Sequence, residues 1–285
     1  MEARIRKYSK KKSVISKSIA RTLMGIQSHI QIDETGDWYR PYVSPFHTKT
    51  GRDCMLGASL GQVPKEYWPR LLSPPQGSVY VLLDYRQEEP MIAAMLAGCK
   101  PLTEWYEQGD IYQQVGEVIT QGALSREQAK KVVNGWLNGM SEKTIADELS
   151  QSIQTVRLWM SKLKSITHPV EQYLVTTAKK IKQKGEVRLL DWRCSVSDSD
   201  GMTALRNWQV QGTGADIMRR ACLALDDAQI PLLLTEHDSF LVRLEEDKYT
   251  DQLERAIKAL TDASATVLGG FQLRVKVDMS LPSSS

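Results

Sequence analysis

Two aspartates interrupt apolar stretches that have strand patterns, and their chemistry is the clearest in the chain. Asp84 ends the apolar run of "VYVLLDYRQEEPMIAAMLAG", where a strand pattern changes into a helix pattern. Asp238 interrupts a second apolar run, "IPLLLTEHDSFLVRL". Mg²⁺ prefers carboxylate oxygens, and two such ions roughly 3.5–4 Å apart can activate an attacking oxygen and stabilise a leaving one. The pair therefore predicts a divalent-metal site. The simpler alternative is that Asp84 only caps the helix that follows it.

Two cations in "SREQAKKVVNGWLNG" suggest a helix face that binds an anion. Arg126 and Lys130 are four residues apart, so on a helix they share a face, where like charges repel. An anion between them would remove this repulsion. A triphosphate fits, because arginine offers a bidentate fork and lysine a point charge. A basic face exposed to solvent is the alternative, and these two residues alone do not decide between the two interpretations.

Composition limits the class of protein that can carry such sites. The chain has 285 residues, of which 41% are hydrophobic, enough for a sizeable core. It has no apolar run of membrane-spanning length and no apolar signal segment at the N-terminus. Its four cysteines are scattered without a CxxC pair, which argues against disulfides or a zinc site and predicts a cytoplasmic location.

Charge is distributed unevenly along the chain. Residues 1–21 contain eight Lys or Arg and one Glu, a local charge of +7 within a total of +3, so the remainder carries −4. A basic arm on a mildly acidic body predicts contact with a polyanion. A solubilising terminus is the alternative interpretation.

The elements that must position these residues are strands and helices that segregate along the chain. Helical patterns fill most of the stretch from Thr103 to Lys184. Strand patterns flank this stretch, and they predict an α+β fold with one sheet and an inserted helical block. The predicted strands lie around residues 30–45, 79–84, 187–192, 230–244 and 271–279.

Five segments resemble, in order, motifs of the family A DNA polymerases, the bacterial DNA polymerase I family. "HTKTGR" resembles T-x-T-G-R, and "LLDYRQEEP" resembles motif A, D-Y-S-Q-I-E-L-R, with "GDIY" following at the family's distance. "SREQAKKVVNGWLNG" resembles motif B, R-x3-K-x3-F-G-x2-Y-G. "NWQVQGTGADIM" resembles N-x-P-x-Q-G-T-A-A-D-I, and "TEHDSFLVRL" resembles motif C, Q-V-H-D-E-L-V-F. Each motif alone is weak, but five in the correct order and spacing are a strong signal.

The resemblance implies a polymerase palm with an antiparallel sheet and an inserted helical fingers subdomain. It divides the chain into four segments, and the short length predicts no full thumb and no exonuclease domain. The segments are a thumb-proximal basic arm, helix and hairpin (1–45), a first palm part with motif A (46–112), fingers with motif B (113–186) and a second palm part with motif C (187–285).

The resemblance also implies roles for individual residues. Asp84 and Asp238 would bind two Mg²⁺ ions, with Mn²⁺ as a substitute and the carbonyl of Tyr85 as a further ligand. Lys130 would also protonate the leaving pyrophosphate, and Glu89 would exclude ribose. The implied deoxynucleoside triphosphate contacts are Arg126, Lys130, Glu89, Gln87, Tyr85 and Asn134. The implied primer-template DNA contacts are Arg52, Asn207, Gln211 and His237.

Several positions depart from the family pattern. The two motif B aromatics are replaced by Asn134 and Asn138. Further departures occur at Met91, Thr203 and Ser239. Loss of the rings predicts slow, low-fidelity nucleotide addition, and the short length predicts a distributive DNA polymerase without proofreading. A separate processivity, helicase or primase protein is left open as a partner.

Three other functions are compatible with the sequence. One is a catalytically degenerate polymerase-like accessory protein that binds DNA. A second is a helix-turn-helix protein, since "MSEKTIADELSQSIQTVRLWM" fits two helices with a turn near residues 149–152 and a recognition helix carrying Gln154, Thr155 and Arg157. A third is a metal-dependent nucleotide hydrolase.

Overall fold

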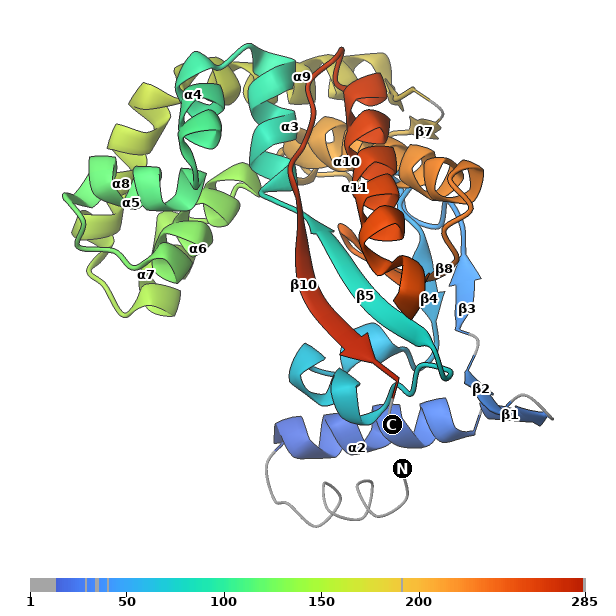
Figure 1. Cartoon of the computed structure of the whole chain (residues 1–285). Coiled ribbons are helices and arrows are strands. Elements are labelled where there is room, and N and C mark those ends of the chain that lie inside the picture. The colour runs from blue at the N-terminus through green and yellow to red at the C-terminus, as the bar shows by residue number, and fades with distance from the viewer. Residues whose placement is uncertain (1–13, 29, 34–35, 40, 191, 284–285) are drawn as a thin grey trace. The chain divides into compact units, whose positions relative to one another are not determined.

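The computed structural model describes residues 14–28, 30–33, 36–39, 41–190 and 192–283 (Figure 1). Residues 1–13, which contain most of the predicted basic arm, lie outside this range. The chain divides into two compact units. The first comprises Met1–Asp84, Gln229–Ala256 and Val277–Ser285, and the second comprises Tyr85–Ala228 and Ile257–Lys276. Within the described ranges, no helix combines the length and apolar character needed to cross a bilayer.

A four-stranded sheet is the centre of the first unit. Its strands are ordered β10 (Val275–Pro282), β5 (Ser78–Tyr85), β9 (Ser239–Glu245) and β8 (Leu232–Glu236), and β10 and β5 are seen side by side in Figure 1. Strands β5 and β9 pair antiparallel, as do β8 and β9. The sheet confirms the α+β class and the strands predicted around residues 79–84, 230–244 and 271–279.

The core of the first unit forms where the sheet meets short helical turns. Trp68, on the 3-10 helix η2 (Lys65–Arg70), is fully buried and packs with Leu82 of β5 and Leu241 of β9. A second cluster joins α2 (Val14–Gln27) to Val63, which follows the 3-10 helix η1 (Leu60–Gln62). Burial of these side chains fixes β5, and therefore the strand end that carries Asp84.

The remaining strands do not join this sheet, so that part of the prediction was wrong. They pair in two-stranded ladders: β1 (Ile30–Asp33) with β2 (Gly36–Tyr39), β3 (Tyr42–Ser44) with β4 (Cys54–Leu56), and β6 (Glu186–Arg188) with β7 (Arg193–Ser195). Each strand finds a partner close in sequence, which costs little loop-closure entropy. The alternation of side chains predicts a strand but does not indicate its partner.

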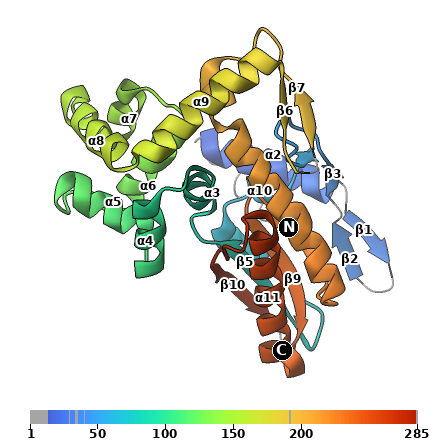
Figure 2. The ribbon, with the colours of Figure 1, turned by 90° about the horizontal axis from the view of Figure 1, so that it is seen from above.

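The second unit is mainly helical, as predicted for the stretch from Thr103 to Lys184. Its helices are well capped: side chains of Asp110, Ser125, Ser141 and Ser152 accept hydrogen bonds from backbone N–H groups in the first turn of the helix that each precedes. Figure 2 shows the neighbouring α7 and α8. The helices are α3 (Glu88–Ala97), α4 (Lys100–Gln108), α5 (Ile111–Thr120), α6 (Arg126–Leu137), α7 (Glu142–Leu149), α8 (Ile153–Ile166) and α9 (His168–Lys184).

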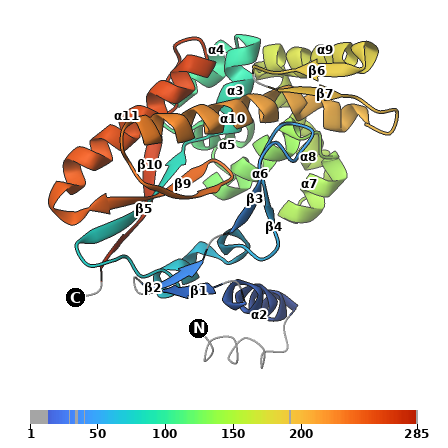
Figure 3. The same ribbon diagram turned by 90° about the vertical axis from the view of Figure 1, so that its right-hand side faces the viewer.

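The long helix α10 (Met202–Asp227) is the central packing element of this unit. Its Leu205 and Trp208 pack in one cluster with Ile181 of α9 and Val187 of β6. Figure 3 shows α9, α10 and the β6–β7 ladder lying alongside one another. Helix α11 (Tyr249–Val267) follows the 3-10 helix η3 (Glu246–Lys248) and leads toward β10.

Candidate active site

The sheet register brings the two predicted metal-binding aspartates together. Strands β8 and β9 are joined by a two-residue turn, His237–Asp238, with Glu236 paired to Ser239. His237 has a φ of 55°, the left-handed conformation that such tight hairpins need. The Ser239 hydroxyl donates to the Glu236 carbonyl at 2.7 Å and so closes the turn. Since Asp84 is the partner of Ser239 across the ladder, it lies beside Asp238.

The electrostatics of this pair fit a bound cation. The pKa of Asp238 is raised to about 6, first by burial and second by the negative charge of Asp84. No three His, Cys, Asp or Glu side chains within the described residues are grouped so that they could hold a metal ion. Two crowded carboxylates are nevertheless a suitable partial donor set for Mg²⁺, which takes carbonyl, water and phosphate oxygens as its other ligands.

The alternative role of Asp84 as a helix cap is wrong. The N-cap of α3 is Gln87, which has a φ of 54°, and Asp84 lies three residues earlier within β5. The Asp84 carboxylate therefore projects from a strand and does not cap the helix.

Two charged residues that sequence reasoning missed also belong to this site. The ammonium group of Lys65 lies 3.2 Å from Oδ2 of Asp278 and 3.9 Å from Oδ2 of Asp84. Lys65 begins η2 and Asp278 lies on β10, so only the fold brings them together. Lys65 thus supplies a positive charge next to the aspartate pair.

The aspartate pair predicts a pH-dependent stability difference between the wild type and Asp238→Asn. The folded-state pKa of about 6 exceeds the ordinary 3.8, so the folded state holds the proton more tightly. The free energy of unfolding of the wild type should therefore fall as pH rises from 3.8 to about 6, by an amount on the order of 1–3 kcal/mol. Asp238→Asn lacks this loss, so without divalent cations it should be more stable than the wild type at pH 7.5 and similar at pH 4. Urea denaturation at several pH values measures this, and a difference that does not vary with pH would contradict it.

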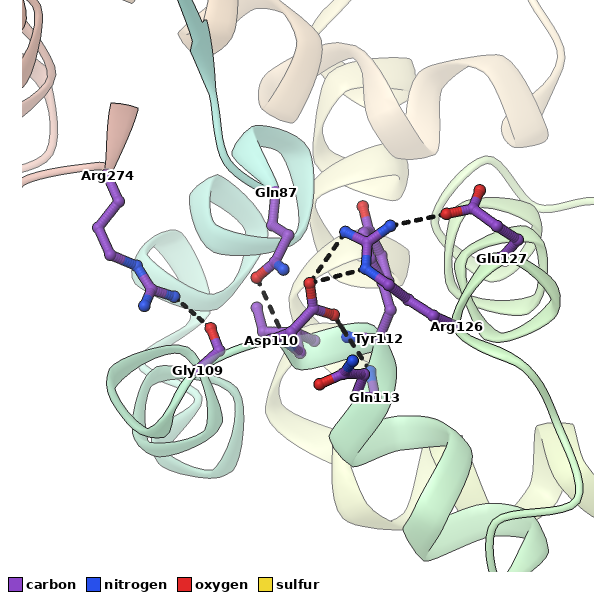
Figure 4. A network of polar contacts seen from close by, with 9 residues as sticks. Gln87, Gly109, Asp110, Tyr112, Gln113, Arg126, Glu127 and Arg274 are labelled. Carbon is purple, nitrogen blue, oxygen red and sulfur yellow. Dashed lines mark hydrogen bonds and ion pairs between the residues drawn. The ribbon is translucent and has the colours of Figure 1, made fainter. Parts of the chain in front are cut away.

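Arg126, one of the two predicted triphosphate ligands, lies in a polar network at the start of α6 (Figure 4). Its Nε and Nη2 atoms each lie 2.9 Å from Oδ2 of Asp110, and Nη1 donates to Oε1 of Glu127 at 2.7 Å. The guanidinium also lies over the Tyr112 ring, 5.3 Å from its centroid. Two carboxylates of the chain therefore already offset the repulsion from Lys130, an effect that the sequence suggested a bound anion would have.

The other predicted nucleotide contacts lie at the end of β5, at the start of α3 and along α6. The Gln87 side chain accepts from the backbone N–H of Ile111 at 3.3 Å, next to Asp110. Glu89 is in the first turn of α3, and Tyr85 is buried with its hydroxyl donating to the Leu260 carbonyl at 2.6 Å. Farther along α6, Lys130 is exposed and Asn134 is partly buried.

The predicted DNA contacts are divided between the two units. Asn207 and Gln211 lie one turn apart on α10, and Asn207 donates to the Asn138 side chain at 2.8 Å. In the first unit, His237 is exposed, and Arg52 closes a short loop by donating its backbone N–H to the Thr48 hydroxyl at 2.9 Å. These positions are structural facts, and the DNA-binding roles stay predictions.

A second polar cluster in the helical unit was also missed. Glu171 on α9 accepts from the Trp136 indole at 2.7 Å and from both terminal nitrogens of Arg206. These bonds tie α6, α9 and α10 together beside Asn207. The only signal in the sequence was the arginine adjacent to Asn207, because residues so far apart along the chain give no local pattern.

The chain belongs to DNA polymerase family A, because the family model matches residues 4–284. It is 24% identical over 256 residues to the DNA polymerase of Mycobacterium phage D29, covering 86% of this chain and 42% of that protein. It is 28% identical over 228 residues to the thermostable DNA polymerase I of Thermus thermophilus, covering 72% and 26%. The chain therefore spans less than half the length of these curated relatives.

A solved structure confirms the fold. The POL domain of Pol1 from M. smegmatis, in complex with DNA primer-template and dNTP, superimposes with a TM-score of 0.80 at 20% identity. The match covers 94% of this chain and 51% of that chain. The polymerase fold predicted from the motifs is thus shown, whereas the four segment boundaries and the residue roles remain predictions.

Proposed function

We propose that this chain is a template-directed DNA polymerase that adds deoxynucleotides to a primer 3′ end by a two-metal mechanism. The observation that carries the proposal is the apposition of Asp84 and Asp238 at the β5–β9 ladder in a family A polymerase fold. The solved relative with primer-template and dNTP supports the same classes of substrate for this chain.

Asp84, Asp238 and the carbonyl of Tyr85 are the groups that would hold Mg²⁺, with Mn²⁺ as a substitute. When bound, the ions would activate the primer hydroxyl and stabilise charge on the leaving pyrophosphate. The pKa of about 6 for Asp238, caused first by burial and then by Asp84, supports this, because a cation compensates the crowded charges. The ammonium group of Lys65 also lies near Asp84, so bound ions would compete with it for that carboxylate.

The residues of the helical unit would bind the incoming nucleotide. Arg126 and Lys130 would hold the triphosphate, and Lys130 would donate a proton to the pyrophosphate as it leaves. Gln87 and Asn134 would contact the nucleotide, and Glu89 would crowd the ribose 2′ position. Arg52, Asn207, Gln211 and His237 would contact the primer-template.

The proposed rate and fidelity follow from the asparagines in motif B. Stacking on an aromatic contributes about 1–3 kcal/mol per base, and Asn134 provides no ring. We therefore propose slow, low-fidelity nucleotide addition. We further propose that the enzyme is distributive and lacks proofreading, and that a processivity, helicase or primase protein is a partner.

A catalytically degenerate DNA-binding protein is the second candidate. The observation that favours it is the replacement of both motif B aromatics by Asn134 and Asn138. The helix-turn-helix alternative has less support, because the family match includes α7 and α8.

Primer extension by the intact chain tests the proposal directly. With a primer-template, four dNTPs and Mg²⁺ or Mn²⁺, we expect template-dependent addition of a few nucleotides per binding event, and no degradation of a mismatched primer. A competitor DNA trap added at the start measures nucleotides added per encounter. DNA binding without extension would favour the degenerate alternative, and absence of both would refute the proposal.

A further inference from the structure

Every N–H-bearing nitrogen of the Arg126 guanidinium has a carboxylate partner, although this residue is the proposed triphosphate ligand. We propose that the two carboxylates act in opposite senses: Asp110 orients Arg126 for the triphosphate, whereas Glu127 competes with the triphosphate for it. This inference rests on the proposed function and adds to it two residues, neither of which is itself a proposed substrate contact.

Asp110 is built as a rigid support. Its Oδ1 accepts from the backbone N–H of Tyr112 at 2.9 Å and of Gln113 at 3.1 Å, which caps α5. Its Oδ2 receives the Nε and Nη2 atoms of Arg126. The two oxygens therefore have separate tasks, and the cap holds the carboxylate in the orientation that receives the arginine.

The backbone behind Asp110 is held as well. Arg274 donates to the carbonyl of Gly109 (Figure 4). Its guanidinium also lies over the Tyr106 ring, 4.0 Å from the centroid. Only 22% of the Asp110 side chain is exposed, so its pairing with Arg126 is weakly screened. Arg126 is thus anchored through its Nε–Nη2 edge, which leaves the Nη1–Nη2 edge to meet an anion.

Glu127 occupies that second edge but is held much less firmly. Its contact with Nη1 is 2.7 Å, yet 73% of its side chain is exposed. Such an exposed pair is weak and gives way to a better acceptor. A phosphate group offers more charge and a bidentate geometry, so it can replace Glu127 while Asp110 stays in place.

The position of Arg126 in its helix supports a role beyond stability. It is the first residue of α6, where a cation is unfavourable for the helix dipole, while the capping box of Ser125 and Gln128 already secures the helix end. An acidic residue such as Glu127 is favourable there. The helix itself therefore gives no reason for the arginine, whereas an arriving polyanion does.

Two isosteric substitutions separate the roles. Asp110→Asn keeps an oxygen for the cap, because asparagine caps as well as aspartate, but it removes the charge that holds Arg126. Glu127→Gln removes only the competing charge. The matched control is Glu142→Gln, which removes a carboxylate in the first turn of α7 that pairs with Arg157 of α8 at 3.0 Å.

Single-nucleotide addition on primer-template and calorimetric binding of inorganic tripolyphosphate are the two readouts. Glu127→Gln should lower the KM for dNTP and the Kd for tripolyphosphate by about threefold, and Asp110→Asn should raise both by about tenfold with kcat changed by less than about threefold. Glu142→Gln should leave both constants unchanged.

Shifts of both variants in the same direction, or no shift in either, would overturn the inference. A purely structural role would lower the melting temperature of Asp110→Asn without moving KM, and that result would also overturn it. Arg126→Ala and Lys130→Ala distinguish the underlying proposal. If both leave tripolyphosphate binding intact, the proposed triphosphate site fails; if both weaken it while the carboxylate variants do not diverge, only the present inference fails.

Discussion

Asp84→Ala and Asp238→Ala are each expected to slow nucleotide addition by about a thousandfold, which corresponds to roughly 4 kcal/mol of transition-state stabilisation. The reason is that the two carboxylates are adjacent across the β5–β9 ladder and are the principal proposed ligands for the catalytic ions. Single-turnover incorporation of one correct dNTP measures the loss. The double variant should be little slower than either single one, because residues that act as a unit are not additive.

The same variants should remain folded, since removing one of two crowded carboxylates relieves repulsion. Circular dichroism and thermal melting in the absence of divalent cations check this. Asp251→Ala, an exposed aspartate on α11, is the matched control and should retain full activity. Near-normal extension by Asp84→Ala or Asp238→Ala would refute the metal assignment.

Lys130→Ala should lower kcat by about a hundredfold, as expected for loss of a general acid, and should also raise the KM for dNTP. The exposed ammonium group lies one turn along α6 from Arg126, so both cations can meet one triphosphate. Steady-state incorporation of one correctly paired dNTP over a range of concentrations separates kcat from KM. The pH dependence of kcat reports the proton donor.

Lys131→Ala is the internal control for Lys130→Ala. Lys131 is also exposed, but it lies about 100° around the helix and so should not reach the same phosphate. We expect its kinetic constants to change by less than about threefold. Equal effects of the two substitutions would mean that the motif B register is wrong.

The sequence by itself determined the family, the helical block and the residues placed at the strand ends. Period and capping signals are local, so α4 to α9 could be predicted from residues within a few turns of one another. Asp84 and Asp238 could be recognised because a carboxylate in an apolar strand pattern is costly without a partner. Motif order then placed both in one family pattern, and the family match confirms the family.

Only the tertiary structure decided which side chains meet. The β5–β9 register places Asp84 beside Asp238, and η2 and β10 add Lys65 and Asp278, a pair separated by 213 residues. Likewise, the start of α5 delivers Asp110 to Arg126, 16 residues later in the chain. A hydrophobic pattern records which face of an element is buried but not its partner, as the separate β6–β7 ladder shows. Charge pairing depends on side-chain direction and distance in space, and these are fixed only when the elements pack.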